Sequence, residues 1–232
     1  MRFQADGKRL LVTTEGSDAL LVVDTAGRLD RAIDIGPGKG HMVALSRDGP
    51  SAFVTRVGAG TGVRVALATG SRRKKPPAGG AEGIAVASDG SVWVSNREDG
   101  TVTVHDPATL DVLDTLASDG FPIRVGFTPS GRHALVTNAR AATLAVFDTV
   151  KRTPVALVPL ARPGAEYRET MLGRAALPIG AIADPSGERV YVAISGGNEI
   201  AVVDTASWTV VERWPTGDEP DALGIVARTP SP

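Results

Sequence analysis

Short apolar runs separated by polar turn residues extend along the whole chain. Residues 121–148 show the unit clearly: an apolar run at 123–127 is followed by a turn at 128–131, a second run at 134–136, and a third run that ends at Asp148. Alternating runs of this length, bounded by Gly, Pro, Ser and Asn, predict strands joined by tight turns. No part of the unit carries the 3.6-residue apolar stripe of a helix.

This unit recurs along the chain. Each copy has a turn glycine, and these glycines follow one another at spacings in the low forties, except for a wider last step. The turn glycines are Gly7, Gly49, Gly90, Gly131 and Gly187. A period of this length with about four strands per repeat is typical of β-propeller blades. We therefore expect a single all-β domain, a β-propeller of about five four-stranded antiparallel blades. The repeats are expected near 1–36, 37–78, 79–118, 119–160 and 178–216, with an insertion at 161–177.

The second strands of the repeats share a common sequence. They read Leu-Val-Thr-Thr at 11–14, Phe-Val-Thr-Arg at 53–56, Trp-Val-Ser-Asn at 93–96, Leu-Val-Thr-Asn at 135–138 and Tyr-Val-Ala-Ile at 191–194. The third strands of four repeats end in an aspartate, and these are Asp24, Asp106, Asp148 and Asp204. The pattern resembles the YVTN-repeat β-propeller family, named for Tyr-Val-Thr-Asn, and the quinoprotein amine dehydrogenase-like propellers. This resemblance implies the fold and, because members are commonly exported, an extracytoplasmic location, periplasmic or secreted; it does not imply a function.

The two ends of the chain complement each other in this pattern. Residues 1–3 are all that precedes the first turn, whereas 217–227 matches an inner strand that no second strand follows. We expect Pro220–Val226 to pair with Leu10–Thr14 and close the ring, because closure removes exposed sheet edges. The resembled family usually has seven blades, so the alternative is an open arc from a seven-bladed parent, shortened at its N-terminus.

Composition and charge limit the classes of partner. The chain of 232 residues is 42% hydrophobic and 22% charged, which is ordinary for a globular domain. A net charge of −1 provides no general attraction for nucleic acid or an anionic membrane. No apolar run is long enough for membrane insertion, and residues 1–6 lack the apolar core of a signal peptide. The absence of cysteine excludes disulfides, thiolate metal sites and cysteine nucleophiles.

Common catalytic motifs do not occur in the sequence. The three histidines, His41, His105 and His133, have no spacing for a helix-borne zinc site. The glycine-rich loop 36–40 lacks the Ser or Thr that follows the lysine of a phosphate loop. His105 lies beside the aspartate at a strand end and is expected to face an inter-blade or outer surface. We expect no metal and no cofactor, with Ca²⁺ as the alternative.

Polar residues stand at the starts of several inner strands. The aligned first positions are His41, Glu82, Ile123, Ile179 and Asp221, and Arg124 follows one residue later. Inner strands line a propeller's central channel, so these side chains are expected to meet at its mouth. The candidate ligand site is therefore His41, Glu82, Arg124 and Asp221. Its mixed charges suit a polar or zwitterionic ligand better than a divalent cation, which Arg124 would repel. Hydration of strand ends is the alternative interpretation.

Four further residues are secondary candidates. Asn96 and Asn138 end second strands and are interpreted as turn residues, since Asn tolerates the left-handed conformation, with a place at the channel mouth as the alternative. Arg162 and Arg168 belong to the insertion 161–177. That insertion joins an outer strand to the next inner strand, on the face where propellers usually bind ligands. It is expected to be either a mobile lid over the channel mouth or a simple surface loop.

The basic stretch 71–77 has no apolar alternation. We interpret it as a solvated outer edge strand, in which charge and proline block edge-to-edge pairing. A basic patch for phosphate or nucleic acid is the alternative. A nucleic-acid partner is not expected, because the stretch offers no aromatic side chain on which bases could stack.

Three functional hypotheses follow. The first is a non-catalytic binding or scaffold propeller that holds a small ligand or a partner protein at the channel face. The second is a metal-dependent lactonase or hydrolase, for which Glu82, Asp221 and Asn138 would supply oxygen ligands. The third is a redox-associated propeller subunit. The absence of a catalytic set favours the first.

Overall fold

The structure is a computed structural model that describes residues 1–74 and 79–226. It divides into two compact units, residues 1–125 and the chain from 126 onward, and each is described by itself. The boundary falls inside one strand, β13 (Pro122–Phe127). Among the described residues there is no helix with the length and apolar character that a bilayer crossing requires.

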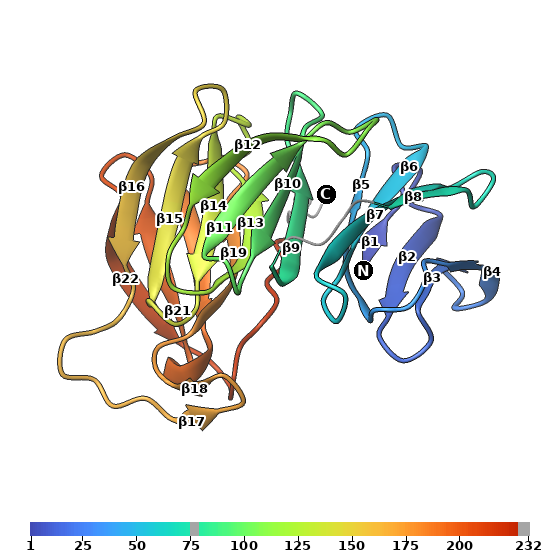
Figure 1. Ribbon diagram of the computed structural model, residues 1–232. Helices are drawn as coiled ribbons and strands as arrows, with labels where there is room; N and C mark the ends of the chain where they lie inside the picture. Colours follow the sequence, from blue (N-terminus) through green and yellow to red (C-terminus); the bar gives the residue numbers. More distant parts are fainter. Residues whose placement is uncertain (75–78, 227–232) are drawn as a thin grey trace, which may run out of the picture. The chain divides into compact units, whose positions relative to one another are not determined.

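The first unit contains three four-stranded antiparallel meanders (Figure 1). One consists of β1 (Arg2–Phe3), β2 (Arg9–Thr14), β3 (Ala19–Asp24) and β4 (Leu29–Asp34). The next consists of β5 (Gly40–Leu45), β6 (Ser51–Arg56), β7 (Thr61–Ala66) and β8 (Arg72–Lys74). The third consists of β9 (Ala81–Val86), β10 (Val92–Asn96), β11 (Thr101–His105) and β12 (Val112–Ala117).

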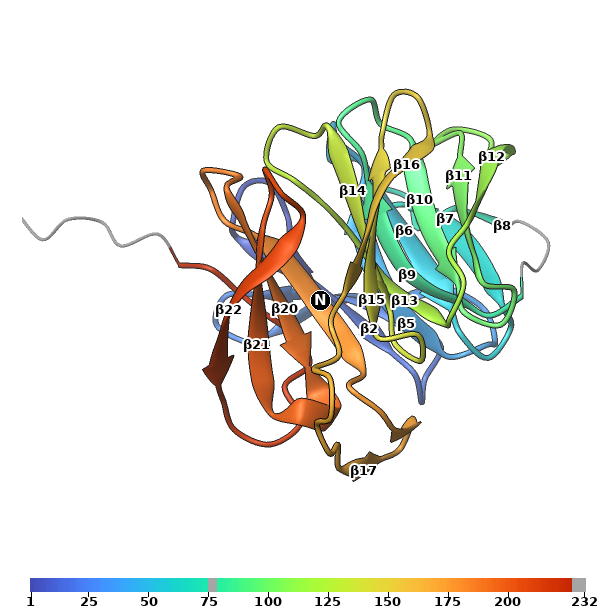
Figure 2. The same cartoon turned by 90° about the vertical axis from the view of Figure 1, so that its left-hand side faces the viewer.

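The second unit contains two further meanders and a small hairpin (Figure 2). The first meander begins with β13 and continues through β14 (His133–Asn138), β15 (Thr143–Asp148) and β16 (Thr153–Pro159). The other consists of β19 (Pro178–Ala183), β20 (Arg189–Ile194), β21 (Glu199–Asp204) and β22 (Thr209–Pro215), with a 3₁₀ turn, η1 (Ser195–Gly197), between β20 and β21. The hairpin consists of β17 (Glu169–Thr170) and β18 (Gly173–Arg174). The expected all-β architecture of four-stranded antiparallel sheets is confirmed.

The aspartates that end the third strands form turns, as the sequence predicts. Asp148 Oδ1 accepts backbone N–H bonds from Val150 at 3.0 Å and Lys151 at 2.8 Å. Equivalent bonds are made by Asp24, Asp106 and Asp204. These backbone donors lower the pKa of all four carboxyls. A repeated side-chain bond of this kind ends each third strand at the same place in the repeat.

The apolar core lies between successive sheets of each unit. In the first unit, Leu11 and Leu20 of the first sheet pack with Val54 and Val63 of the second, and all four are at most 1% exposed. A second cluster joins the second sheet to the third. In the second unit one cluster joins the sheet of β13–β16 to that of β19–β22. A middle strand between two stacked sheets is buried on both faces, and its alternate residues enter different clusters, as Val54 and Phe53 of β6 do.

The predicted pairing of Pro220–Val226 with Leu10–Thr14 is not confirmed. β2 pairs with β3 along its whole length, and on its other edge β1 pairs with it only at Leu10 and Leu11, with Arg2 opposite Leu11 and Phe3 opposite Leu10. The described part of the expected closing strand, 217–226, forms no strand, and residue 227 lies outside the described residues.

The C-terminal segment instead packs on the last sheet. The position that a Cβ would take on Gly180 of β19 lies 2.1 Å from the carbonyl oxygen of Asp221. Further along, Leu223 and Ile225 line a groove with Tyr191 and Trp214. The same close approach occurs in the first unit, where Ile123 lies against Gly83 of β9. The segment thus takes the place beside β19 that an inner strand takes beside β9, which matches its sequence alignment with 121–127.

Candidate functional site

Glu82 is the centre of a charged cluster in the first unit. Its side chain is only 5% exposed. His41 Nε2 lies 2.8 Å from Glu82 Oε1, although off the direction needed for a hydrogen bond, and Arg124 Nη1 lies 3.4 Å from the same oxygen. Arg97 Nη1 donates to Glu82 Oε2 at 2.9 Å. One buried carboxylate is therefore in contact with three cationic side chains.

His41 lies between two carboxylates. Its Nδ1 is 2.8 Å from Glu15 Oε1, on the opposite side of the ring from Glu82. Contact with Glu82 raises the pKa of His41, burial acts against this rise, and Glu15 adds to it. Burial by itself would raise the pKa of Glu82, but His41, Arg97 and Arg124 outweigh burial and lower it. The two groups are therefore an ion pair over a wider pH range than isolated side chains would be.

Two members of this cluster were not found by sequence reasoning. Arg97 follows the strand-ending Asn96, and its guanidinium lies 5.5 Å from the centre of the Phe121 ring. Glu15 follows β2 and binds His41. Each is the first residue after a second strand. This shared position in the repeat is the sequence feature that could have identified both as members of the cluster. Alignment of the inner strands alone could not reveal them.

Threonines of the second strands fix the starts of the following inner strands. Thr13 Oγ1 donates to the carbonyl oxygen of His41 at 2.6 Å, and Thr55 Oγ1 donates to that of Glu82 at 2.7 Å. In the second unit, Thr137 Oγ1 makes the same bond to Ile179 at 2.7 Å. This bond gives a physical role to the threonine of the repeated motif. It holds the backbone of each candidate residue against the preceding sheet.

A glycine brings Arg124 to Glu82. A Cβ on Gly83 would lie 2.7 Å from the carbonyl oxygen of Ile123 and 2.8 Å from Arg124 Cα, closer than any side chain allows. The Gly83 N–H donates to Ser95 Oγ at 2.9 Å, which fixes the glycine on its own sheet. The start of β13 can therefore lie directly against β9, and Arg124 follows Ile123 into the cluster.

The structure brings together three of the four primary candidates, His41, Glu82 and Arg124. Asp221 belongs to the second unit, where its backbone lies against Gly180. Its membership of the site stays a prediction.

The left-handed conformation predicted for Asn96 and Asn138 is wrong. Neither has a positive φ, and both are fully buried. The Asn138 amide donates to Thr143 Oγ1 at 3.1 Å, and the Asn96 amide donates to Thr101 and Thr103, also at 3.1 Å. Each asparagine therefore ties the end of its second strand to the third. Contact of either asparagine with a ligand stays a prediction.

Arg162 and Arg168 anchor the insertion 161–177 within the second unit. Arg162 Nη2 lies 3.6 Å from Glu199, and Arg168 Nη1 lies 2.8 Å from Asp218. The Arg168 N–H also donates to the carbonyl of Gly196 at 3.1 Å. The hairpin of β17 and β18, which follows Arg168, extends past the ends of β20, β21 and β22 (Figure 2). Both arginines hold the insertion to its sheet, and its action as a lid stays a prediction.

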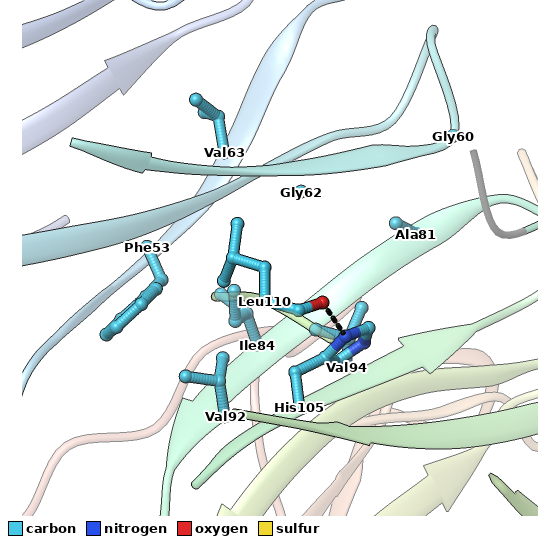
Figure 3. Close-up of a pocket in the computed structure, with 10 residues that line it drawn as sticks. All are labelled: Phe53, Gly60, Gly62, Val63, Ala81, Ile84, Val92, Val94, His105 and Leu110. Carbon is cyan, nitrogen blue, oxygen red and sulfur yellow. Dashed lines mark hydrogen bonds between the residues drawn. The ribbon is translucent and has the colours of Figure 1, made fainter. Parts of the chain in front are cut away.

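His105 faces a cavity between two sheets of the first unit (Figure 3). The cavity, lined by apolar residues such as Phe53 and Val63, measures about 30 Å³, which is room for a water but not for an organic ligand. His105 Nδ1 lies 3.1 Å from the Leu110 carbonyl oxygen, and Nε2 lies 2.8 Å from Thr103 Oγ1. Both ring nitrogens thus have internal partners, and His105 is a structural residue.

No group of three or more His, Asp or Glu side chains with metal-binding geometry occurs in residues 1–74 and 79–226. Two of the residues predicted as oxygen ligands for calcium, Glu82 and Asn138, make other contacts. Both oxygens of Glu82 contact cationic side chains, and Asn138 is buried between strands. The described residues therefore offer a polar cluster of mixed charge rather than an oxygen cage.

Comparison with solved structures shows the fold. A streptogramin B lyase has a TM-score of 0.79 at 15% identity, with 95% of this chain and 70% of that chain covered. A catalytically inactive variant of virginiamycin B lyase from Staphylococcus aureus, with quinupristin, has a TM-score of 0.79 at 13% identity and covers 95% and 71%. Hydrazine synthase from Kuenenia stuttgartiensis has a TM-score of 0.67 at 14% identity and covers 95% and 87%.

Virginiamycin B lyase and hydrazine synthase are β-propeller proteins, so these similarities support a β-propeller fold for this chain. Identities this low carry no information on activity. By sequence, the chain matches no protein-family profile and no curated protein.

Proposed function

We propose that this protein is a non-catalytic, YVTN-type binding propeller, whose five sheets are successive blades and whose ligand site is the cluster around Glu82. The observation that supports the proposal is the convergence of His41, Glu82 and Arg124 from the starts of three successive inner strands. Side chains so distant in sequence meet only through the fold, as those of binding sites do. An extracytoplasmic location is part of this proposal and rests on the family resemblance alone.

The charges of the cluster indicate the class of ligand. Three cationic side chains, His41, Arg97 and Arg124, face three carboxylates, which are Glu15, Glu82 and Glu98. The side chains of Glu15 and Glu98 are more than half exposed, whereas that of Glu82 is buried. An incoming carboxylate would meet the guanidinium groups, and an incoming ammonium group would meet the exposed carboxylates. A small zwitterion, such as an amino acid or a short peptide end, fits this arrangement.

The test uses free amino acids and dipeptides as probes, with thermal shift followed by calorimetry. We expect at least one probe to bind the unaltered protein and Arg124→Ala to abolish that binding. Arg64→Ala is the matched control, since Arg64 donates to Ser51 and Ala108 and takes no part in the cluster. The proposal fails if no probe binds, or if both substitutions weaken binding equally.

A second candidate function is lyase chemistry, suggested by the flanked histidine His41 and by the lyases among the structural neighbours. It is less well supported, because both ring nitrogens of His41 already contact carboxylates and neither is placed to accept a proton. Mass spectrometry of each bound probe after incubation separates the two: an unchanged probe supports binding, and a cleaved probe supports catalysis.

Metal-dependent hydrolysis is a weaker candidate, since three cations next to Glu82 would repel Ca²⁺. A calcium titration followed by thermal denaturation tests it directly. The redox-associated role stays a prediction.

A further inference from the structure

A second group of charged side chains lies in the first unit, apart from the cluster around Glu82. It includes Arg72 and Lys74 of β8, the described part of the basic stretch 71–77; residues 75–77 lie outside the described residues. β8 is the outermost strand of its sheet, as the edge-strand interpretation predicts (Figure 1). Arg72 and Lys74, two residues apart, point to the same side of the sheet.

Three cationic groups converge above Gly36, the glycine that follows β4. The position that a Cβ would take there lies 3.1 Å from Arg72 Nη1, 3.1 Å from Lys74 Nζ and 3.3 Å from Arg56 Nη1. Gly36 has a φ of 77°, so a side chain is disfavoured here for its backbone as well as for its surroundings. Gly36 is buried, and three positive charges from two strands therefore lie in close contact around it.

Arg56 is the buried member of this group. It is 5% exposed, and its bonds go to the carbonyl oxygens of Pro37 at 3.0 Å and Ile35 at 3.4 Å and to the Thr61 hydroxyl at 2.5 Å. Its Nε is buried without a hydrogen-bond partner among the described residues. Burial, followed by the charge of Arg72, lowers the pKa of Arg56. A buried guanidinium with neutral partners alone is costly, and a nearby anion would offset that cost.

The protein supplies little compensating charge at this point. Asp34 Oδ2 lies 2.9 Å from Arg72 Nη1, but the Asp34 side chain is 70% exposed and its Oδ1 accepts the Gly36 N–H at 2.6 Å. Asp18 Oδ1 accepts the N–H groups of Gly38 and Lys39, and its charge opposes the lowering of the Arg56 pKa without outweighing it. The charge of Lys74 also acts on Asp34, so this one carboxylate is shared by two cations. The group therefore keeps a local excess of positive charge.

We propose that Arg56, Arg72 and Lys74 form a binding site for a phosphate-type dianion beside Gly36. A guanidinium offers paired N–H donors to two oxygens of such a group, and the lysine adds a point charge. The site is independent of the ligand cluster at Glu82. The glycine-rich loop 36–40 contributes a residue without a side chain, Gly36, around which the three cations gather. It does not contribute a cradle of backbone donors, because two of its N–H groups already bind Asp18.

The experiment is isothermal titration with inorganic phosphate at fixed ionic strength, with acetate as the monoanionic comparison. We expect the unaltered protein to bind phosphate more tightly than acetate. Arg72→Gln and Lys74→Gln should each weaken phosphate binding about tenfold or more, the loss typical of one charge-assisted contact. Both side chains lie on an edge strand, so the variants are expected to fold.

Arg73→Gln is the matched control. Arg73 lies between the two site residues on the same strand and points to the opposite side of the sheet. We expect it, and Arg124→Ala, to leave phosphate binding within about twofold of the unaltered protein. The proposal is overturned if the unaltered protein does not bind phosphate, if acetate binds as tightly, or if Arg73→Gln weakens binding as much as Arg72→Gln. Tighter binding of a short single-stranded oligonucleotide that depends equally on Arg73 would also overturn it, in favour of a nonspecific basic surface.

Discussion

At the scale of single residues, Glu82 and His41 illustrate how burial and charge decide a protonation state. A carboxyl as buried as Glu82 would normally favour its neutral form. Three cations in contact with it reverse that preference. His41 responds in the opposite sense and holds its proton to higher pH. Each residue thus keeps the other charged.

This coupling predicts a pH dependence of stability. The raised pKa of His41 means that its contribution is fully present below the ordinary histidine value of 6.5 and is lost as pH rises through the folded-state value. The lowered pKa of Glu82 means that its contribution is present above 4.5 and is lost as pH falls through its folded-state value. We therefore expect the stability difference between the unaltered protein and His41→Gln to be greatest between these two values. Urea denaturation at a series of pH values measures it.

His133→Gln provides a comparison of opposite sign. Burial, followed by the charge of Arg132, lowers the pKa of His133, so its neutral form is favoured in the folded state. The contribution of His133 to stability should decline as pH falls below 6.5. In the same pH range the contribution of His41 is at its full value. A difference for His41→Gln that does not change with pH would contradict the ion pair.

At the scale of the strand, the repeated threonine explains why the second-strand motif recurs. The motif does not itself provide the ligand site. Its threonine hydroxyl bonds to the next inner strand and sets the position from which His41 or Glu82 extends. Where the motif ends in asparagine, the amide ties its own strand to the third strand. Both are buried polar contacts, which a fold must satisfy wherever strands meet.

Thr55→Val tests this role. Valine keeps the shape and removes the hydroxyl that donates to the Glu82 carbonyl and accepts the Met42 N–H. Because Thr55 is fully buried, we expect a loss of about 1–3 kcal/mol in the free energy of unfolding, measured by urea denaturation. Thr115→Val, on the exposed face of β12, is the control and should change stability by less than about 0.5 kcal/mol. Equal effects of the two substitutions would refute the role of the threonine bond.

At the scale of the whole molecule, the C-terminal segment follows the sequence pattern of an inner strand but does not pair as one. The segment resembles an inner strand and takes the corresponding place beside β19, yet it makes no ladder. On that edge of β2, only Leu10 and Leu11 have strand partners, and these belong to β1. The segment is held instead by polar contacts of Asp218 and Glu219 with Arg168 and Asn198, by side-chain packing and by a close backbone approach.

Gly180→Ala tests that approach. A Cβ there would overlap the Asp221 carbonyl, so we expect displacement of the segment and a loss of about 1–3 kcal/mol in unfolding free energy. Trp214, which lines the groove with Leu223 and Ile225, should report the displacement as a change in fluorescence. Truncation after Thr216 should change the fluorescence in the same direction.

Gly126→Ala is the control for this substitution. Gly126 is also in an inner strand, but its nearest neighbour, the Ala181 carbonyl oxygen, lies 3.7 Å from the Cβ position, an ordinary contact. Similar behaviour of the two alanine variants would show that the segment is not held against Gly180.

The sequence by itself determined the strands, the turns and the repeat, because these depend on local alternation and on residues such as Asp148 that bond to their own neighbours. It also identified His41, Glu82 and Arg124, because equivalent positions of a repeat fall at equivalent places in the fold. Only the tertiary structure decided which residues contact one another. It placed Arg97 and Glu15 in the cluster, and it buried Asn96 and Asn138 in hydrogen bonds between strands. It also paired β2 with β1 rather than with the C-terminal segment. These outcomes depend on contacts between residues distant in sequence. The sequence pattern is compatible with several pairings, and burial in the folded protein decides which of them forms.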